Sequence, residues 1–400
     1  MRPLKLFFFV SLSIGLNKTF AQEMKGLPEN ASEKVKKWAI QFDFDDDSCY
    51  PAPAISPYGK TNPGLKATGT RTGDCRDLEQ LKNSNTYVRS HSVIKNGHTY
   101  EIIMYALYFE KDQYSPWTAV ELKWSHRHDW EWACVWLKDG RLTHASYSAH
   151  GSDGETKPIS SLTDIVSNNH LRIVYHQHNV RTHAMRFAQT EEKIVGWTSD
   201  VVKKSPIYKE VIESPENDLK KWLTPKLVQW DRLTLKQREL LAQDWGSANP
   251  PFIAANFFDE IRNYKPESYP SVSEWKRSKN FLLSGERLNS GEKLFSSNGA
   301  YMLRMQEDDG NLCVYKSNNG TQGTFVWGSY QSKKYDLGAS HYLSMQNDGN
   351  LCIYDKTNRF KWGSSQVKPY STTEGSKLVL TDTGKLNILN SKGQVVWKND

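Results

Sequence analysis

Residues 126–137, with the sequence HRHDWEWACVWL, begin with a dense polar cluster and continue as an aromatic β-strand. Successive side chains of a strand point to opposite faces of its sheet. One face therefore carries Trp130, Trp132, Cys134 and Trp136, and the other carries Asp129, Glu131, Ala133, Val135 and Leu137. This alternation predicts two carboxylates side by side, about 7 Å apart along the strand, at the mouth of an otherwise apolar face.

The polar cluster has the chemistry of a cation site. Asp129 and Glu131 repel each other unless a cation or a proton lies between them, and we expect His126 and His128 on the loop leading into the strand. Carboxylates with one or two imidazoles and water favour Mg²⁺, Ca²⁺ or Mn²⁺ over structural Zn²⁺. The spacing leaves three interpretations open: a divalent-cation site, acid/base catalysis, or a solvated strand end whose acids Arg127 neutralises.

The composition indicates a folded, β-rich, two-domain protein. The chain has 400 residues, 38% of them hydrophobic, with 14 Trp and 19 Tyr. Residues 1–21 have the charged start, short apolar run and small residue of a secretory signal, so we expect a secreted, extracellular protein. Removal of its three basic residues lowers the formal net charge from +7 to +4, and no concentrated basic stripe predicts nucleic-acid binding.

The coarse organisation follows from turn residues and periodicity. We expect strands over 99–109, 129–137, 143–148 and 171–175, and helices over 32–40, 205–222 and 233–245. The predicted domains are 34–266 and 280–400, joined by a linker over 267–279 that lacks periodicity. Cys49 and Cys75, both in loop sequence, make a plausible disulfide in an oxidising compartment, whereas Cys134 is expected to be a buried thiol.

The C-terminal part of the chain repeats itself. Trp327, Trp362 and Trp397 are spaced 35 residues apart, and each marks the same point in a unit that also contains the segments QEDDGNLCVY, QNDGNLCIY or LTDTGKLNIL. Such a period, with Asp-Gly turns, indicates one small β unit used three times. We expect the three Trp to form a shared core.

The polar cluster resembles the heptapeptide GHRHDWE of the necrosis- and ethylene-inducing-like proteins, a family of secreted cytolysins. Further similar segments occur in the same order: CYPAPA (49–54), GDCRD (73–77), NTYVRS (85–90), IMYALYFEKDQ (103–113), SAHG (148–151), THAMR (182–186) and WGSANPPF (245–252). The resemblance covers about residues 40–265. The chain departs from the pattern at Ser125, where the motif has Gly, at Glu110, where Pro is expected, and in a longer connection from Asp112 to His126.

This resemblance implies a mainly β fold, a central β-sandwich flanked by helices, in which Cys49 and Cys75 correspond to the family's disulfide. It implies a divalent cation, Mg²⁺ or Ca²⁺, ligated by Asp112, His126, Asp129 and Glu131. His128 and His150 would orient these ligands without binding the cation themselves. Family members bind the sugar headgroups of glycosylinositol phosphorylceramides, which are plant glycosphingolipids, and disrupt the plasma membrane from its surface without an established enzymatic reaction.

The repeats resemble the monocot mannose-binding (bulb-type) lectins, which are three-sided β-prisms with the motif Q-x-D-x-N-x-V-x-Y. The resemblance implies mannose-type glycans as partners. The second repeat supplies Gln346, Asp348, Asn350, Cys352 and Tyr354. The first repeat is read as Glu307, Asp309, Asn311, Cys313 and Tyr315, and in the third repeat, where Thr381 begins the motif, the site is expected to be lost.

Three functions follow as alternatives. The first is a secreted cytolysin whose lectin module adds a second carbohydrate contact. The second is a non-lytic glycan-binding protein of the same fold, with its cavity reshaped by the long connection after Asp112. The third is a metal-dependent enzyme of cupin type, because the spacing His126-x-His128-x-x-Glu131 also resembles the cupin motif, although its further distant His and Gly-framed barrel pattern are not found.

Overall fold

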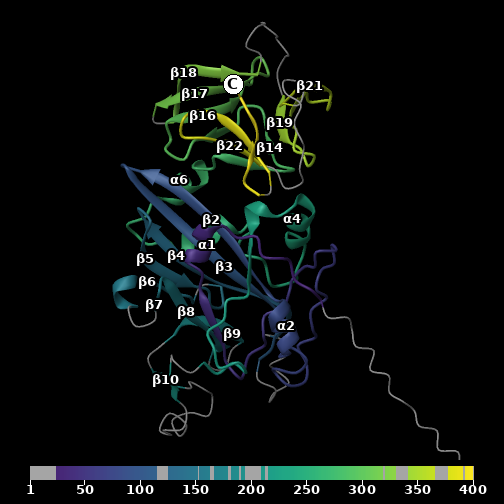
Figure 1. Cartoon of the computed structure of the whole chain (residues 1–400), viewed down its shortest axis with the longest axis vertical. Coiled ribbons are helices and arrows are strands. Elements are labelled where there is room, and N and C mark those ends of the chain that lie inside the picture. Colours follow the sequence, from purple (N-terminus) through teal and green to yellow (C-terminus); the bar gives the residue numbers. More distant parts are fainter. Residues whose placement is uncertain are drawn as a thin grey trace, which may run out of the picture.

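The computed structural model describes residues 24–114, 125–151, 153–162, 166–178, 182–188, 191–193, 209–211, 215–318, 320–329, 341–364, 377–390 and 392–399. Its strands gather into two units, the N-terminal unit (residues 24–277) and the C-terminal unit (residues 281–399) (Figure 1). The expected signal segment, residues 1–21, lies outside the described residues, and the predicted domain limits stay predictions. Within the described residues, no helix is both long and apolar enough to cross a membrane.

A six-stranded sheet forms the centre of the N-terminal unit. Its order is β12-β2-β3-β4-β5-β6, and only the β12–β2 pair is parallel. The strands are β2 (Asn85–Lys95), β3 (His98–Asp112), β4 (His126–Lys138), β5 (Arg141–Tyr147), β6 (Thr156–Pro158) and β12 (Lys226–Gln229). Asn96-Gly97 and Asp139-Gly140 close its two tight hairpins with positive φ at both residues, as two-residue turns between twisted strands require. The strands predicted over 99–109, 129–137 and 143–148 are confirmed.

A second, smaller sheet packs against one face of the first. It contains β1 (Gln41–Phe44), β7 (Val166–Ser167), β8 (His170–Gln177) and β9 (His183–Phe187), all joined through β8. The core between the two sheets includes Ala133, Val135 and Leu137, one face of β4, and Phe109 stacks on Tyr175 with ring centroids 3.8 Å apart. The expected β-sandwich is therefore present.

The other face of β4 packs against helices. Trp130, Trp132 and Trp136 lie in a second core together with α4 (Leu235–Leu241) and α5 (Phe257–Tyr264). The strand alternation read from the sequence is thus confirmed on both faces. Shorter helices are α1 (Glu33–Lys37), within the predicted helix 32–40, α2 (Leu78–Asn83), and the 3₁₀ turns Ile159–Ser161 and Trp230–Arg232.

One predicted helix is wrong, and the expected linker contains a short helix. In the predicted helix 205–222, residues Lys209–Val211 form strand β11, paired with β10 (Glu191–Lys193), and the described residues from 215 onward form turns. Pro215, in the interior of this segment, interrupts a helical hydrogen-bond pattern there. The expected linker contains α6 (Val272–Arg277), opened by a Ser271–Glu274 capping box.

The C-terminal unit consists of three four-stranded sheets of similar design, as expected for a β-prism. Their orders are β15-β16-β17-β18, β14-β19-β20-β21 and β13-β22-β23-β24. The strands are β13 (Phe281–Leu283), β14 (Arg287–Leu288), β15 (Lys293–Phe295), β16 (Tyr301–Met305), β17 (Leu312–Asn318), β18 (Thr321–Gly328), β19 (Tyr342–Met345), β20 (Leu351–Tyr354), β21 (Phe360–Gly363), β22 (Lys377–Leu380), β23 (Leu386–Leu389) and β24 (Val395–Lys398). Trp327, Trp362 and Trp397 share one buried core, which confirms their predicted role.

The two units are in direct contact. The ammonium of Lys377 lies 2.6 Å from the carboxylate of Asp231, and the guanidinium of Arg238 donates to the carbonyl of Ser284. Leu283 packs into the helix-side core of the N-terminal unit. Figure 1 shows the C-terminal unit next to helix α4 of the N-terminal unit.

Candidate metal centre

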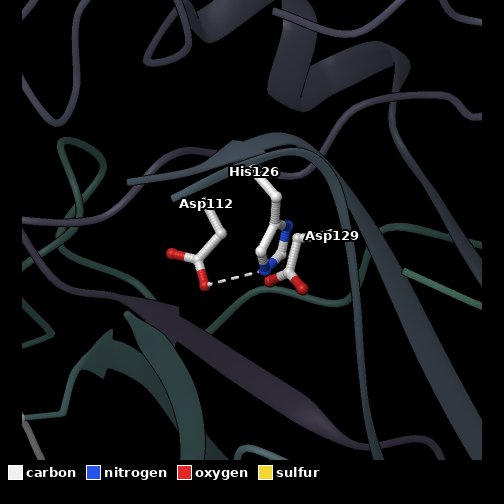
Figure 2. Close-up of side chains that lie close together, drawn as sticks. All are labelled: Asp112, His126 and Asp129. Atoms are coloured by element: carbon white, nitrogen blue, oxygen red, sulfur yellow. Dashed lines mark ion pairs between the residues drawn. The ribbon is translucent and has the colours of Figure 1, made fainter. Parts of the chain in front are cut away.

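The last residue of β3 and the first residue of β4 begin the site. Asp112 and His126 are cross-strand partners, and Asp129 follows three residues later on β4. One ligand atom from each of these three residues lies within 4.8 Å of the others (Figure 2). Asp112 and Asp129 are buried, whereas His126 is partly exposed. The structure thus brings together three of the four residues predicted to hold a cation.

An unusual backbone conformation at His128 separates the two histidines. Its φ is +62°, in the left-handed region that non-glycine residues rarely adopt. The ring of His128 turns toward the helix side, where Nδ1 lies 2.6 Å from the hydroxyl of Tyr108 and the ring meets Trp245 edge-on. His126, by contrast, turns toward Asp112. Both histidines lie in β4 itself, so their expected place on an entering loop is wrong.

His126 is oriented as a metal ligand would be. Its Nδ1 lies 2.7 Å from the backbone carbonyl of His128, which can only accept, so Nδ1 carries the hydrogen. Nε2 then presents its lone pair on the side of Asp112, whose Oδ2 is 3.9 Å away. Ligating histidines commonly fix their ring in this manner.

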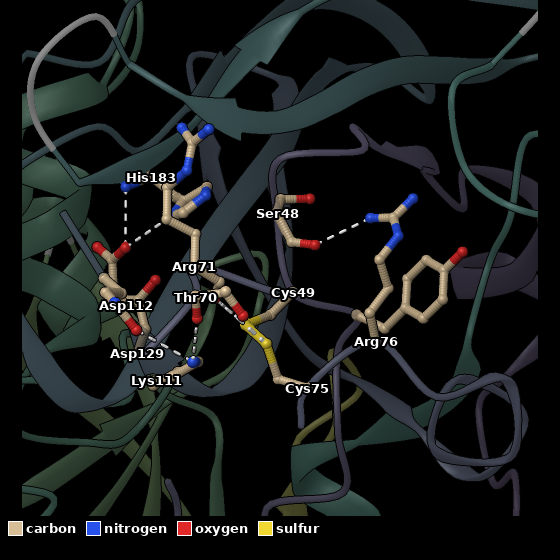
Figure 3. Close-up of a disulfide and its surroundings, with 12 residues drawn as sticks. Ser48, Cys49, Thr70, Arg71, Cys75, Arg76, Lys111, Asp112, Asp129 and His183 are labelled. Atoms are coloured by element: carbon tan, nitrogen blue, oxygen red, sulfur yellow. Dashed lines mark hydrogen bonds and ion pairs between the residues drawn. A yellow bond between two sulfur atoms is a disulfide. The ribbon is translucent and has the colours of Figure 1, made fainter. Parts of the chain in front are cut away.

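A fourth residue, His183, holds Asp112 in place. Its backbone N–H and its Nδ1 lie 2.9 and 2.7 Å from Asp112 Oδ1, and its Nε2 donates to the carbonyl of Asp47 at 2.8 Å (Figure 3). Burial alone would lower the pKa of His183, but the hydrogen bond and charge of Asp112 outweigh it and raise that pKa. In the sequence, His183 stands out only as part of the segment THAMR (182–186). Its contact depends on β9 packing beside the end of β3, which no spacing reveals.

The carboxylates of the site disfavour one another's charge. Burial and the charge of Asp112 raise the pKa of Asp129 to about 7. Burial and the charge of Asp129 raise the pKa of Glu131 well above its usual range. Burial also acts against ionised Asp112, but the hydrogen bond and charge of His183 hold its pKa low. A buried group of acids with an oriented imidazole fits a hard divalent cation, which would compensate this repulsion.

Glu131 lies beside the trio of Asp112, His126 and Asp129 but is not part of it. Its Oε2 accepts from the hydroxyl of Ser148, and it is not among the residues whose ligand atoms cluster within 4.8 Å. Its role as a ligand stays a prediction. Arg127 donates at 2.8 and 2.7 Å to the carbonyls of Pro63 and Gly64, so its guanidinium faces that loop rather than the acids.

The close approach of Gly64 explains part of this geometry. Gly64 has φ +62°, and a Cβ there would lie 2.6 Å from Cε1 of His128.

His150 occupies the turn that follows Ser148, also with positive φ, and its Nε2 lies 3.1 Å from Nδ1 of His178. His150 is therefore positioned by a second histidine, and its supporting role toward the ligands stays a prediction.

Two of the three departures from the family pattern form hydrogen bonds in the structure. Ser125 Oγ accepts from the backbone N–H of Tyr114 at 2.8 Å, closing the base of the connection between the ligands. Glu110 accepts from the side-chain amide of Asn62 at 2.9 Å. Most of the long connection itself, residues 115–124, lies outside the described residues. The Cys49–Cys75 disulfide is present, with a Cα–Cα distance of 5.1 Å, and both its sulfur atoms lie near the carbonyl of Arg71 (Figure 3).

The second repeat presents a group of polar side chains, the second polar set (Gln346, Asp348, Asn350 and Tyr354). The amide of Gln346 donates to the hydroxyl of Tyr354 at 2.7 Å. Asp348 accepts from the backbone N–H of Asn350 at 2.9 Å. The carbonyl oxygen of the Asn350 side chain accepts from Ser364, also at 2.9 Å.

The first repeat has the same arrangement with a different residue. The amide of Gln306, not Glu307, lies 2.8 Å from the hydroxyl of Tyr315, and Glu307 instead pairs with Arg304. The assignment of Glu307 to the motif is thus wrong, because one extra residue in the turn shifts the spacing. The first polar set is Gln306, Asp309, Asn311 and Tyr315, and its Asp309–Asn311 contact repeats that of the second.

The third repeat lacks these side chains. At the corresponding positions Thr381 and Thr383 bond to each other, and Leu389 replaces the Tyr. The backbone N–H of Leu386 donates to the side chain of Asn399, which takes the place of the serine seen in the other two repeats. Two of the three sheets therefore carry a complete polar set.

Comparison with known proteins identifies a family for the N-terminal unit. Residues 32–264 match a family model described as "Necrosis inducing protein (NPP1)". "NLP effector protein 7" of Phytophthora capsici is 27% identical over 240 residues, which are 58% of this chain and 60% of that protein. The chain therefore matches about three fifths of that relative's length.

Two solved structures are each similar to part of the chain. One, described as "Toxin fold as basis for microbial attack and plant defense", is 26% identical and covers 61% of this chain and 97% of its own, with a TM-score of 0.45. Another, a monomeric monocot mannose-binding lectin from Gastrodia elata, is 27% identical and covers 30% of this chain and 96% of its own, with a TM-score of 0.24.

Proposed function

The chain belongs to the NPP1 family of necrosis-inducing proteins, and on this premise we propose that it is a secreted cytolytic toxin of virulence type. It binds a divalent cation, docks on the sugar headgroups of glycosylinositol phosphorylceramides and disrupts plant-type plasma membranes. It acts through recognition and carries out no enzymatic reaction. Contact with the membrane is peripheral.

The observation that carries this proposal is the trio Asp112, His126 and Asp129. Its ligand atoms converge within 4.8 Å, and the two buried carboxylates disfavour each other's charge. Mg²⁺ or Ca²⁺ suits oxygen ligands with one imidazole, and we assign Glu131, the next residue after Asp129 on the same face of β4, as the fourth ligand. Such a cation, when bound, supplies open positions for vicinal hydroxyls of a terminal hexose.

Secretion is supported by two observations. Residues 1–21 have the pattern of a signal peptide, and the Cys49–Cys75 disulfide suits an oxidising environment. The relatives named as effectors of Phytophthora capsici also fit extracellular action.

The C-terminal unit acts as a mannose-type lectin module. The two complete polar sets support this role, because each combines amide, carboxylate and hydroxyl groups that can bond to sugar hydroxyls. Joined to the metal centre in one chain, two weak sugar contacts lengthen residence on a glycan-coated surface through effective concentration.

The test is dye leakage from vesicles that contain plant glycosylinositol phosphorylceramide. We expect wild type to cause leakage, EDTA to abolish it, and Asp129→Ala to behave as wild type in EDTA. The matched control is Asp259→Ala, which removes an exposed acid of α5 far from the trio in sequence. Leakage that is changed neither by EDTA nor by Asp129→Ala would rule out the cation-dependent mechanism.

A non-lytic glycan-binding protein is the alternative. The connection from residue 113 to residue 125, which joins two of the ligands, is longer than the family pattern. Under this alternative, EDTA-sensitive binding to the same vesicles persists without dye release. Vesicle co-sedimentation run beside the leakage assay separates the two functions.

A further inference from the structure

Each repeat that has a complete polar set also has an exposed phenylalanine. Phe325 on β18 and Phe360 on β21 have exposed fractions of 52% and 43%, among the highest of the large hydrophobic residues described. The third repeat has Val395 at the corresponding place, 53% exposed. The aromatic ring thus accompanies the polar sets and is replaced where they are missing.

The sheet register places each ring beside the tyrosine of its polar set. Phe325 is the cross-strand partner of Tyr315, and Phe360 that of Tyr354. A register shift at this point skips one residue, so that the nearby Trp327 and Trp362 reach the core while the phenylalanines stay outside. In both repeats the Phe and Tyr rings meet edge-on, with centroids 5.9 Å apart.

A glycine lets each ring lie against the backbone next to the asparagine. A Cβ on Gly363 would lie 3.1 Å from the Phe360 ring and 3.4 Å from Nδ2 of Asn350. A Cβ on Gly328 would meet the Phe325 ring at 3.3 Å in the same way, and Asn311 at 3.2 Å. The third repeat has Lys398 at this position. Each exposed ring therefore packs against the tyrosine of a polar set and over the glycine that neighbours its asparagine.

We propose that Phe325 and Phe360 form a second sugar subsite on each of the two sheets. The polar set holds the terminal mannose, and the phenylalanine ring takes the apolar face of the next pyranose of a mannose-type oligosaccharide. An aromatic face beside directed hydrogen-bonding groups suits a ring that is apolar on its faces and polar at its edge. This inference rests on the proposed lectin role and narrows its ligand from a monosaccharide to a mannose oligosaccharide.

A lipid surface is the competing occupant for an exposed phenylalanine. Two features favour sugar. The two rings lie on different sheets of the unit, and each packs edge-on against its own tyrosine and over its own glycine. Membrane insertion is nevertheless included among the outcomes below.

The experiment is calorimetric titration of the full chain with methyl α-mannoside and with a mannose disaccharide. We expect the wild type to prefer the disaccharide. The double variant F325A/F360A should lose about fivefold in disaccharide affinity, the size of an aromatic contact, and keep its monosaccharide affinity. Phe→Trp at both positions should retain the preference. The matched control is Val395→Ala, which truncates the equivalent exposed residue of the third repeat and should change neither affinity.

Equal disaccharide affinity in wild type and double variant would overturn the subsite while leaving the lectin role intact. If the double variant instead loses binding to vesicles that contain no mannose, the rings serve a membrane and the subsite is overturned. If wild type binds neither sugar, the proposed lectin role fails and the subsite fails with it. The metal-dependent leakage assay is independent of all these outcomes.

Discussion

The metal centre of the N-terminal unit and the polar sets of the C-terminal unit differ in charge, burial and origin. Asp112 and Asp129 are buried charges that come together from two strands and are held by a third. Each polar set is local, lies within one hairpin and the strand beside it, and consists mainly of neutral groups already bonded to each other. A buried acid cluster requires a counter-charge, whereas a neutral surface set requires only its ligand. The two kinds of site should therefore respond to different perturbations.

The largest expected difference concerns the disulfide, which cross-links the N-terminal unit alone. Cys49 and Cys75 are 26 residues apart, so the double variant Cys49→Ser/Cys75→Ser should lower the free energy of unfolding of this unit by about 3.5 kcal/mol. Chemical denaturation measures the change. A reductant should reproduce it in wild type and have no further effect on the variant, and mannose binding should persist. An unchanged denaturation midpoint in the double variant would contradict a stabilising role of the disulfide.

The second difference between the two units concerns the stability of the N-terminal unit at acid pH. Burial, with the charges of Arg89 and Lys279, lowers the pKa of His91 to about 4, while its Nε2 contacts the carbonyl of Trp275 at 2.9 Å. Because this pKa lies below the unfolded value of about 6.5, the unfolded chain binds more protons between these two pH values. The free energy of unfolding should fall by an amount on the order of 3 kcal/mol as the pH falls from about 6.5 to about 4.

The control for this window is His91→Gln, which keeps a hydrogen-bond donor but does not titrate. Its unfolding free energy should depend less steeply on pH than that of wild type between the same limits. Equal slopes in denaturation curves recorded at several pH values would show that His91 is not the responsible group.

The third difference concerns cations. Mg²⁺ or Ca²⁺ at a hundredfold excess over its dissociation constant should stabilise the N-terminal unit by about 2.7 kcal/mol, because only the folded trio binds it. EDTA should reverse the gain, and neither reagent should change mannose affinity. Thermal unfolding with each ion measures the stabilisation, and mannose titration in EDTA measures the mannose affinity. Loss of mannose binding in EDTA would break the distinction between the two units.

The smallest expected effect lies within the C-terminal unit. Asn350→Ala should weaken mannose binding at that site by about tenfold, since it removes one amide that directs hydrogen bonds. Asn387→Ala removes an amide from the third repeat, at the position of Cys352, where the polar set is missing, and should have no effect. Similar losses in both variants would mean that the complete sets are not the binding sites.

The sequence predicted what depends on local alternation and failed where distant contacts decide. Strand parity correctly assigned Trp130, Trp132 and Trp136 to one core and Asp129 to the opposite face. Asp112 required the family resemblance, because it lies on another strand. His183 could not be found by spacing, since its contact with Asp112 depends on how β9 packs against the end of β3.

Two other features of the structure had signals in the sequence. Gln306 stands one position before the expected motif residue, and an extra residue in the Asp-Gly turn restores its alignment with Gln346. The expected linker contains Ser271-x-x-Glu274, a capping box that begins α6 and carries Trp275 into the core. Local turn and cap chemistry decide the structure at both places.

The central claim is that the trio of the N-terminal unit holds a divalent cation and that the C-terminal unit does not. Calorimetric titration with Mg²⁺ and Ca²⁺ tests it on wild type, on Asp129→Asn and on Asp348→Asn, which neutralises a carboxylate of the second polar set. We predict one bound cation in wild type, an affinity at least about tenfold lower in Asp129→Asn, and wild-type affinity in Asp348→Asn. Equal cation affinity in wild type and Asp129→Asn would contradict the account.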